Sequence, residues 1–251
     1  MIGPKQEETL AGQDVTDEVL ERFRKVGLAT VYSGVSKHGY NLCFMQGVQS
    51  FTPGRRLVGR ARTVRYVTGR PDLSEEANQG ENAPEYRAMG SCGPGDVLVA
   101  GANGFADSAI GGDMVLLHLK IVGAEGVITD AGIRDMPAVV AYGYGVFAGA
   151  ATPGSRFPKL VSHEDNVDVV CGGITVRPGD VIVAEDSDIV CVPRQHAEEV
   201  IEWAEEHEEL EEIVKAMILR DGCPPGRHYN AETFERLERE RRANTTPGPA
   251  V

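Results

Sequence analysis

The chain has 251 residues, of which 41% are hydrophobic, and this composition is typical of a globular protein with one sizeable core. Its formal net charge of −13 argues against a nucleic-acid backbone or an anionic membrane surface as partner. The five cysteines are odd in number and contain no CxxC pair, which favours free thiols. We see neither a signal peptide nor an apolar segment long enough to span a bilayer, so the sequence predicts a cytoplasmic protein.

The first part of the chain is predicted to contain two helices and a long strand. Residues 1–14 are expected to form a loose leader, and DVTDEVLERFRKV predicts a helix with Thr16 as its N-cap. A second short helix is expected over ATVYSGVSKHG. Valines among arginines in PGRRLVGRARTVRYVTG predict a strand, and the polar segment RPDLSEEANQGENAPEY is expected to be a loop or an irregular insertion.

The middle of the chain alternates strands and helices, which indicates a partly parallel sheet covered by helices. GPGDVLVAGAN predicts a turn and a strand, and GGDMVLLHLKIVGAEG predicts a helix that ends at a glycine. GVITDAG and YGVFAGA predict short strands. Three further strands are expected within VDVVCGGITVRPGDVIVAEDSDIVCVP, and its RPGDVIVA resembles GPGDVLVA as a second copy of one turn-strand unit.

The C-terminal part is predicted to be helical and strongly charged. The acidic run over residues 198–214 favours a long helix with a solvated face over an acidic interaction tail. The segment LRDGCPPGRHYN should end this helix, and a second charged helix is expected over about residues 231–242, before a polar tail. We therefore predict a main domain over residues 1–205 and a helical extension with its tail over residues 206–251.

Three charged residues in the centre could carry chemistry. Asp113 begins a predicted helix after two glycines, and Arg134 and Asp135 follow the strand GVITD. Taken singly, Asp113 is typical of an acid that stabilises a helix N-terminus, and Arg134-Asp135 of a surface ion pair or a helix cap. Each residue alone therefore has an ordinary structural explanation.

The joint arrangement of these residues favours a binding site. Ligands of α/β sheets bind beyond the carboxyl ends of the strands, so Asp113, Arg134 and Asp135 share one rim if DVLVA and GVITD are parallel neighbours. Carboxylates bind a hard divalent cation, a helix N-terminus binds an anion, and a guanidinium binds a carboxylate or a developing oxyanion. These groups suit metal-assisted chemistry on a small keto acid.

Other polar residues give weaker indications. The six histidines form neither HxxxH nor HExxH, and His118 in an apolar helix is typical of packing. Asp107 and Ser108 are expected in a loop, with lining of the site as the less favoured alternative. Asp130 is expected either to orient Arg134 or to close a turn.

Several longer segments carry a resemblance to a known family. They are PGRRLVGRARTV, GPGDVLVA, the stretch from Gly111 to Asp135, and VRPGDVIVAEDSDIVCVP, in that order. Over roughly residues 17–200 the chain resembles the RraA-like proteins. This family includes divalent-metal pyruvate aldolases that act on 4-hydroxy-4-methyl-2-oxoglutarate and 4-carboxy-4-hydroxy-2-oxoadipate. Its aldolase members carry an Asp, twenty residues and Arg-Asp, which Asp113 and Arg134-Asp135 match here.

The resemblance implies a role for each residue of this motif. Asp135 would be the direct protein ligand of Mg²⁺ or Mn²⁺, and Asp113 would hold metal-bound water and help to position a proton-shuttling water. Arg134 would bind the keto-acid oxygen. Backbone amides of the first helical turn would hold the substrate carboxylate, and they belong to Gly112, Asp113, Met114, Val115 and Leu116.

The reaction implied by the resemblance is cleavage of a 4-hydroxy-2-oxo acid, a small anionic keto acid, with release of pyruvate. It would pass through an enolate stabilised by the metal and Arg134, so oxaloacetate decarboxylation would be a side activity. The implied fold is α/β, a layered α/β/β/α arrangement related to the swivelling phosphohistidine-type domain, with a mixed sheet. The implied assembly is a homotrimer or a homohexamer with sites at subunit interfaces.

Two departures from the family pattern bear on the distal half of the substrate pocket. Many relatives have SDAL where this chain has SGVS at residues 33–36, and the usual glycine before the last strand is Asp188 here. Two other functions stay open, namely a non-catalytic regulatory binding protein of the RraA type and a different metal-dependent reaction such as decarboxylation or hydration. The presence of Asp113 favours an enzyme over the regulator.

Overall fold

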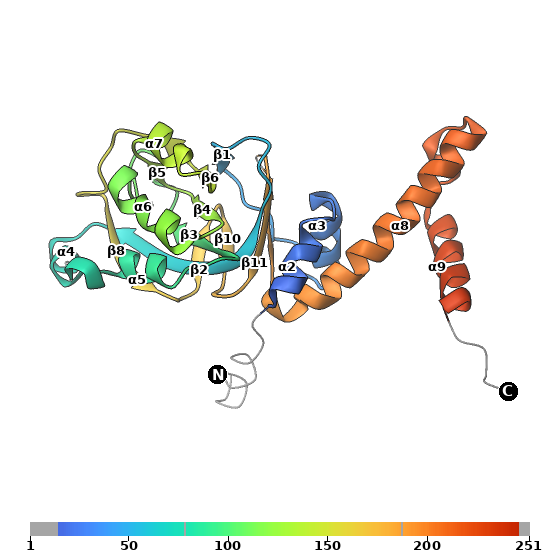
Figure 1. Ribbon diagram of the computed structural model, residues 1–251, viewed down its shortest axis with the longest axis horizontal. Coiled ribbons are helices and arrows are strands. Elements are labelled where there is room, and N and C mark those ends of the chain that lie inside the picture. Colours follow the sequence, from blue (N-terminus) through green and yellow to red (C-terminus); the bar gives the residue numbers. More distant parts are fainter. Residues whose placement is uncertain (1–14, 78, 187, 246–251) are drawn as a thin grey trace, which may run out of the picture. The chain divides into compact units, whose positions relative to one another are not determined.

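The computed structural model describes residues 15–77, 79–186 and 188–245. The chain divides into two compact units, Met1–Ile201 and Glu202–Val251 (Figure 1). The expected leader over residues 1–14 and the end of the expected tail, residues 246–251, lie outside the described residues. Within the described ranges, no helix is both long and apolar enough to cross a membrane.

The first unit begins with the two predicted helices, α2 (Asp17–Phe23) and α3 (Leu28–Lys37). Thr16 is the N-cap of α2, and its hydroxyl accepts a hydrogen bond from the Val19 backbone N–H at 3.4 Å. Both helices bury one face, and the buried side chains include Phe23 of α2 and Val31 of α3. The N-terminal helical predictions are therefore confirmed.

A mixed eight-stranded sheet forms the centre of this unit, with its path in the order β1-β6-β4-β3-β2-β11-β12 and with β8 paired to β2. The pairs β2–β3, β3–β4 and β4–β6 are parallel, and the remaining pairs of this sheet are antiparallel. This pattern confirms the predicted mixed sheet. The strand bounds are β1 (Gln49–Ser50), β2 (Leu57–Thr68), β3 (Asp96–Gly101), β4 (Gly126–Thr129), β6 (Gly145–Ala148), β8 (Leu160–Asp165), β11 (Val181–Glu185) and β12 (Asp188–Val192).

The sheet is buried on both faces, and alternate residues of one strand enter two different cores. In β3, Leu98 and Ala100 join the core under the helices, whereas Val97 and Val99 join the core on the opposite face. The helices of the first core are α5 (Pro84–Gly90), α6 (Asp113–Val122) and α7 (Met136–Ala141). The opposite core is covered by the hairpin of β9 (Val169–Cys171) and β10 (Ile174–Val176).

Helix α3 lies against β11 and β12, beyond the parallel half of the sheet (Figure 1). The structure therefore has helices over one face of the mixed sheet and the second sheet of β9 and β10 over the other, in agreement with the layered fold that the family resemblance implies. The layering matters for function because β3, β4 and β6 all end at the same edge of the sheet.

Two segments differ from their predictions. The polar segment expected to be a loop forms α4 (Pro71–Ala77), the 3₁₀ turn η1 (Gly80–Asn82) and α5. Its polar composition hides a helix whose Ala88 and Met89 are buried against the sheet. The region expected to give three strands holds four, because Gly172-Gly173 turns β9 into β10 ahead of β11 and β12.

The two similar turn-strand units have the same local structure. In each one the aspartate backbone N–H donates to the carbonyl three residues earlier, Asp96 to Gly93 at 3.0 Å and Asp180 to Arg177 at 3.1 Å. Each aspartate side chain accepts the backbone N–H of that same residue in return, at 3.0 and 2.9 Å. The glycine before each aspartate has a positive φ, as the third residue of a type II turn requires.

The second unit is a pair of helices. Helix α8 (Ala197–Asp221) starts in the first unit and continues into the second, and α9 (Ala231–Thr245) follows the 3₁₀ turn η3 (Pro225–Arg227). Leu210, Val214 and Leu237 form the small core of this unit. The predicted long acidic helix, its break and the second charged helix are all present.

Candidate active site

Three loops that follow parallel strands meet at one edge of the sheet. The loop after β3 leads to α6, the loop after β4 contains β5 (Gly132–Ile133), and the loop after β6 contains β7 (Ala150–Ala151). Ala109 pairs with Gly132 in a parallel bridge, and β5 pairs with β7 in parallel. We call Ala109, β5 and β7 the rim ladder, because they repeat the order of β3, β4 and β6 just beyond the sheet.

Backbone hydrogen bonds fix the rim ladder closely. The N–H of Ile110 donates to the Gly132 carbonyl, and the N–H of Arg134 donates to the Gly111 carbonyl, both at 3.0 Å. Gly132 has no room for a side chain, since a Cβ there would lie 2.3 Å from Thr152 Cγ2. The predicted meeting of the Asp113 and Arg134 segments at one rim is therefore confirmed, and its cause is a backbone ladder.

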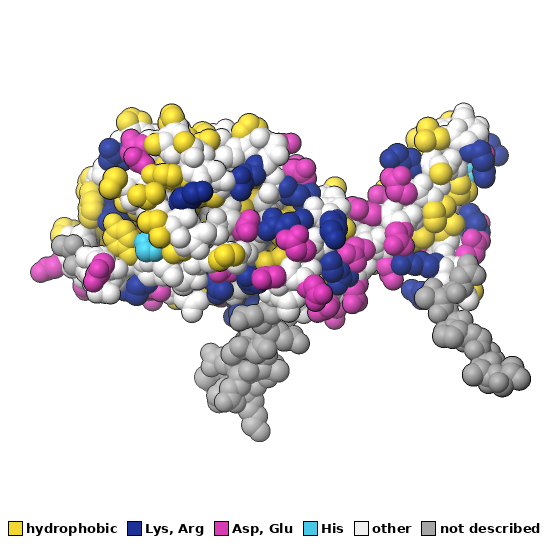
Figure 2. Space-filling model, in the orientation of Figure 1, with side chains coloured by type: hydrophobic (Ala, Val, Ile, Leu, Met, Phe, Trp, Pro, Cys, Tyr) yellow, Lys and Arg dark blue, Asp and Glu magenta, His cyan; other side chains and the backbone are white. Residues whose placement is uncertain are grey.

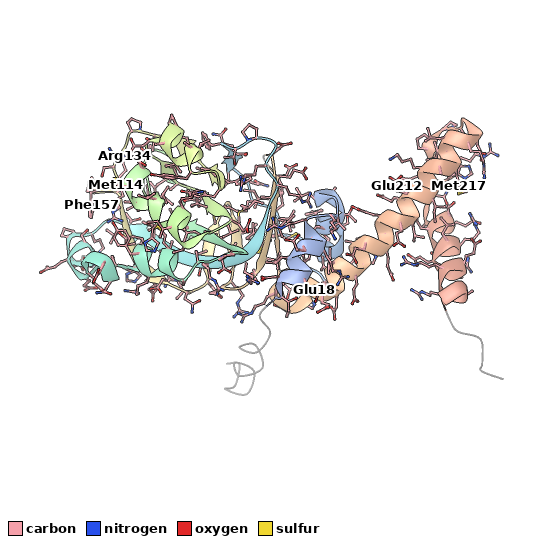
Figure 3. The ribbon with its side chains drawn as sticks, in the orientation of Figure 1. Glu18, Met114, Arg134, Phe157, Glu212 and Met217 are labelled. Atoms are coloured by element: carbon pink, nitrogen blue, oxygen red, sulfur yellow. The ribbon has the colours of Figure 1, made fainter. Side chains whose placement is uncertain are left out.

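A cavity of about 330 Å³ opens at this rim. Met114, Arg134 and Phe157 lie close together on the same side of the first unit (Figure 3). The cavity contains all but one of the residues predicted for the site, because the Leu116 side chain is buried. Its lining is Ala109, Ile110, Gly111, Gly112, Asp113, Met114, Val115, Arg134, Asp135, Ser155, Arg156 and Phe157.

Asp113 is the first residue of α6, after Gly112 as the N-cap. The hydroxyl of Tyr142, which follows α7, donates a hydrogen bond to the Asp113 carboxylate. This hydrogen bond raises the pKa of Tyr142, so the phenol stays protonated and remains a donor at neutral pH. Tyr142, which the sequence did not single out, therefore orients the Asp113 carboxylate.

Asp135 lies beside the N-cap of α6 and has a left-handed backbone with φ of 51°. A Cβ on Gly112 would stand 2.7 Å from Asp135 Oδ2 and 3.0 Å from Arg134 Cβ, so a side chain at this position would displace the Asp135 carboxylate. Arg134 and Asp135 are both exposed. Neither side chain has a hydrogen bond or ion pair to another residue in the described ranges.

This donor set suits a hard divalent cation. Two carboxylates, Asp113 and Asp135, line one cavity, and Asp135 is exposed and available as a ligand. Oxygen ligands of this kind with room for several waters are what Mg²⁺ and Mn²⁺ prefer. The residues present therefore fit the cation that the family resemblance implies.

The first turn of α6 also offers donors to an anion. The first backbone N–H groups of an α-helix have no intrahelical acceptor, and here they belong to Asp113, Met114 and Val115. Leu116 differs, because its N–H donates to the Gly112 carbonyl at 2.9 Å and its side chain is only 1% exposed. Of the predicted amides, that of Leu116 is therefore already used inside the helix.

Arg156 is a cavity residue that sequence reasoning missed. It comes from the loop after β7, and its guanidinium donates to the Glu85 carboxylate of α5. Glu85 is 2% exposed and accepts a second hydrogen bond from the Ser162 hydroxyl. Arg156 and Phe157 also line a neighbouring cavity of about 640 Å³. A buried carboxylate thus holds a guanidinium in the wall that the two cavities share.

The other candidate residues have structural roles. Asp130 accepts backbone hydrogen bonds from Ala102 at 2.7 Å and Gly104 at 2.9 Å, so it fixes the loop after β3. Asp107 forms an exposed ion pair with Lys159. His118 is half-buried, and instead of only packing it lines the neighbouring cavity.

The fold is a layered α/β/β/α arrangement. Its candidate site lies beyond the carboxyl ends of the parallel strands, where α/β proteins bind their ligands. The family model described as "RraA-like: Aldolase/RraA" matches residues 14–191. The chain therefore belongs to the RraA-like family.

Known relatives carry two different descriptions. A protein of Halalkalibacterium halodurans named "Putative 4-hydroxy-4-methyl-2-oxoglutarate aldolase" is 32% identical over 65% of this chain and 72% of its own length. The crystal structure of RraAS2 from Streptomyces coelicolor is described as an unusual member of the RNase ES inhibitor RraA family. It matches with a TM-score of 0.73 and 29% identity over 81% of this chain and 99% of that chain.

A third comparison supports the fold alone. The structure of an uncharacterized protein from Pseudomonas syringae matches with a TM-score of 0.73 at 24% identity, over 86% of this chain and 94% of that chain. The names of the relatives thus point to an aldolase and to a regulator, and the residues of the site must decide between them.

Proposed function

We propose that this protein is a divalent-metal-dependent aldolase that cleaves a 4-hydroxy-2-oxo acid and releases pyruvate. The observation that carries the proposal is the convergence of Asp113, Arg134 and Asp135 in one cavity, at the free amides of a helix N-terminus. The name of the relative from Halalkalibacterium halodurans supports the same class of reaction.

Asp135 would hold the cation, Mg²⁺ or Mn²⁺, and Asp113 would hold its water ligands. When bound, the cation would supply Lewis-acid stabilisation of negative charge on the substrate. The Tyr142 hydroxyl keeps the Asp113 carboxylate turned toward the cavity, which suits a group that positions a water for proton transfer.

The substrate carboxylate would bind the amides of Asp113, Met114 and Val115, and Arg134 would bind the 2-keto oxygen. A base removes the proton of the 4-hydroxyl group, a carbonyl forms at C4, and the electrons of the C3–C4 bond pass into a pyruvate enolate. Arg134 would stabilise the charge of this enolate. A water positioned by Asp113 then returns a proton to C3 and completes pyruvate.

The remaining part of the substrate would lie toward Arg156. Its guanidinium stands at the wall shared with the neighbouring cavity, where a second carboxylate of the substrate would find a charged partner. Oxaloacetate would give the same enolate by loss of carbon dioxide, so decarboxylation is expected as a side activity.

An assembly of several copies, a homotrimer or a homohexamer, is part of the proposal. Hydrophobic side chains gather on the face of the first unit that carries α6 (Figure 2). Met114 is 80% exposed and Phe157 is 53% exposed, both at the cavity. Such apolar exposure beside a polar site suits a neighbouring subunit that closes the pocket.

The description of the Streptomyces coelicolor relative supports an alternative, a non-catalytic protein that binds an RNase. A different metal-dependent reaction at the same site, decarboxylation or hydration, is the other alternative. A regulator needs neither the oriented Asp113 nor the close approach of Gly112 to Asp135, so the geometry favours the aldolase.

The deciding experiment is a coupled assay of pyruvate release from a panel of 4-hydroxy-2-oxo acids and oxaloacetate, with Mg²⁺ and then with a chelator. We expect chelator-sensitive cleavage of at least one hydroxy-oxo acid. Decarboxylation of oxaloacetate alone would indicate the same enolate chemistry on another substrate. A folded protein that releases no pyruvate from any of these acids would refute the proposal.

Two substitutions test the assigned roles. Asp135→Ala should abolish metal-dependent turnover because it removes the ligand, and Arg134→Ala should lower kcat by about 10²–10³-fold because it removes one charged donor to the enolate. Both residues are exposed, so circular dichroism should show an unchanged fold. Normal turnover with normal metal dependence in either variant would contradict the mechanism.

A further inference from the structure

We propose that His38, His196 and Glu199 form a second metal site that takes a divalent transition metal of the zinc class. His38 is the C-cap of α3, His196 is the last residue of the 3₁₀ turn η2 (Arg194–His196), and Glu199 lies in the first turn of α8. All three belong to the first unit. None of them lines the candidate active site, so this inference is independent of the proposed function.

The two imidazoles converge on a single carboxylate oxygen. His196 Nδ1 lies 3.1 Å from Glu199 Oε2, and His38 Nδ1 lies 3.5 Å from the same atom. The ligand atoms of all three residues lie within 4.8 Å of one another. Zinc bonds of about 2.0–2.1 Å in a tetrahedron imply ligand separations of about 3.4 Å, so small side-chain adjustments would place one ion among all three.

Neighbouring aromatic groups hold the histidines in this arrangement. The rings of His38 and His196 are stacked, with centroids 4.5 Å apart and planes inclined by 28°. The ring of Tyr40 lies against His196 at 5.6 Å, and its hydroxyl accepts a hydrogen bond from Gln195 Nε2 at 2.9 Å. The ligands are therefore largely preorganised, which lowers the entropic cost of binding.

The chemistry of the ligands selects the metal. Two imidazoles and one carboxylate favour Zn²⁺, Co²⁺ or Ni²⁺ over Mg²⁺, which prefers an all-oxygen environment. The Glu199 side chain is 63% exposed, so water can complete the coordination. The alternative is a metal-free cluster in which the two imidazoles contact Glu199 directly, and measurements of metal binding separate the two.

A metal here would join the end of α3 to the start of α8. These segments are distant in the sequence, and at the site they meet through the contact of the His38 imidazole with the Glu199 carboxylate, whose side chain is 63% exposed. A ligand that binds only the folded state raises its stability. We therefore expect Zn²⁺ to raise the thermal unfolding temperature of the protein through this site.

The test is equilibrium dialysis of the chelator-treated full chain against Zn²⁺ with Mg²⁺ in excess, so that oxygen-ligand sites are filled by Mg²⁺. The wild-type chain should bind one Zn²⁺ that Mg²⁺ does not displace. His38→Ala, His196→Ala and Glu199→Gln should each weaken binding by more than about tenfold, since even indirect partners of metal ligands cost that much. Glu199→Gln keeps the size of the side chain and so guards against a misfolded variant.

His163→Ala is the matched control, because His163 is partly exposed and faces a single carboxylate, Glu164, at 4.0 Å. It should bind Zn²⁺ like the wild type. Co²⁺ should give the intense visible absorption of a tetrahedral site in the wild type and in His163→Ala, and this absorption should be lost in the three site variants. Zn²⁺ affinity that is unchanged in those variants, or a wild-type chain that retains no Zn²⁺, would overturn the proposal.

Discussion

At the scale of single residues, the candidate active site depends on the absence of a side chain at Gly112. Its hydrogen in place of a side chain lets the N-cap of α6 approach Asp135 and Arg134. The rim carboxylate can then lie next to the free amides of the helix. The cation site and the anion site that we propose would therefore be neighbours within one cavity, as binding of a chelated keto acid would require.

Gly112→Ala is predicted to abolish or strongly lower activity while the fold is kept. The new Cβ would stand 2.7 Å from Asp135 Oδ2, and the exposed carboxylate would turn away and leave its place as a metal ligand. Steady-state kinetics across a Mg²⁺ titration should show a raised metal requirement. Gly90→Ala is the control, because its nearest heavy atom would be His118 Nε2 at 3.9 Å. Equal kinetics for the two variants would contradict this interpretation.

Arg156 is predicted to set affinity for the distal carboxylate of the substrate. Arg156→Lys should raise KM for dicarboxylic hydroxy-oxo acids by about ten- to a hundredfold, the worth of a hydrogen bond to a charged group. Turnover at saturation should change less. Glu85→Gln should act in the same direction, because it removes the buried charge that holds the guanidinium.

The control for this pair is Arg177→Lys, which alters an exposed ion pair with Asp168 outside both cavities. It should leave KM unchanged. If Arg156→Lys lowers kcat and spares KM, then Arg156 acts on the reacting atoms and does not bind the distal carboxylate.

At the scale of elements, loops that carry function are held by backbone contacts and by buried carboxylates. Asp130 is 8% exposed and accepts two N–H groups from the loop that leads to α6. Asp180 does the same for the turn before β11 and the start of η2, with Arg177 and Arg194 as donors. Such groups give irregular backbone a fixed shape without regular secondary structure.

Asp130→Asn is predicted to destabilise the fold by about 1–3 kcal/mol, since the amide accepts at one atom only and leaves the N–H of Ala102 or Gly104 without this acceptor. Burial raises the pKa of Asp130, so the folded state holds its proton more tightly than the unfolded chain. Wild-type stability from this group therefore falls as the pH rises from the unfolded pKa to the folded pKa. The asparagine does not titrate. The free energy of unfolding of Asp130→Asn should therefore fall furthest below that of the wild type in acid.

Urea unfolding of both proteins at about pH 4 and about pH 7 measures this difference, because the ordinary pKa of an aspartate is about 3.9 and burial raises that of Asp130. A deficit that grows as the pH rises would show that Asp130 is stabilised chiefly as the carboxylate. Thr129→Ser, at the preceding residue, is a control that keeps the hydroxyl bond to the Ala100 carbonyl.

At the scale of the whole molecule, the sheet with a core on each face leaves most cysteines inaccessible. Cys43, Cys92, Cys171 and Cys191 are buried, whereas Cys223 is partly exposed. Burial raises the pKa of Cys92 to about 12 and the pKa values of Cys171 and Cys191 well above the usual range. A buried thiol that stays protonated is a poor nucleophile.

We therefore predict that a thiol reagent at mildly alkaline pH labels one cysteine rapidly in the folded protein, and all five after unfolding in denaturant. Mass spectrometry of peptides should place the fast label at Cys223. Cys223→Ser should remove the fast phase. Rapid labelling of Cys92 in the native protein would mean that α5 opens readily from the sheet.

The sequence predicts which residues meet when they are close together in the chain, and it fails when they are far apart. The pattern of Asp113, Arg134 and Asp135 lies within one strand-helix-strand unit, so parallel pairing sufficed to bring the three residues together. Arg156 and Glu85 are far apart in sequence and meet only through tertiary packing. The pairing of His38 with His196 has the same character, since no spacing rule connects a C-cap to a turn at the far end of the sheet.

Local sequence propensity also failed to predict helices and strands that are stabilised chiefly by packing against the sheet. The segment before α5 is polar and does not mark the start of α5, a helix that is held by the burial of Ala88 and Met89 against the sheet. The strands on either side of Gly172-Gly173 are only three residues long each. Strands this short gain stability from the sheet they cover, and periodicity alone does not register them.

Each of the three loops joined by the rim ladder contributes different residues to the candidate site. The first brings a helix N-terminus and Asp113, the second brings Arg134 and Asp135, and the third brings Arg156 and Phe157. Because the loops are joined through backbone atoms, side chains in the third can be exchanged without disturbing the other two. If the proposed enolate chemistry resides in the first two loops, evolution could keep it unchanged and alter the acid that is bound by replacing side chains of the third loop.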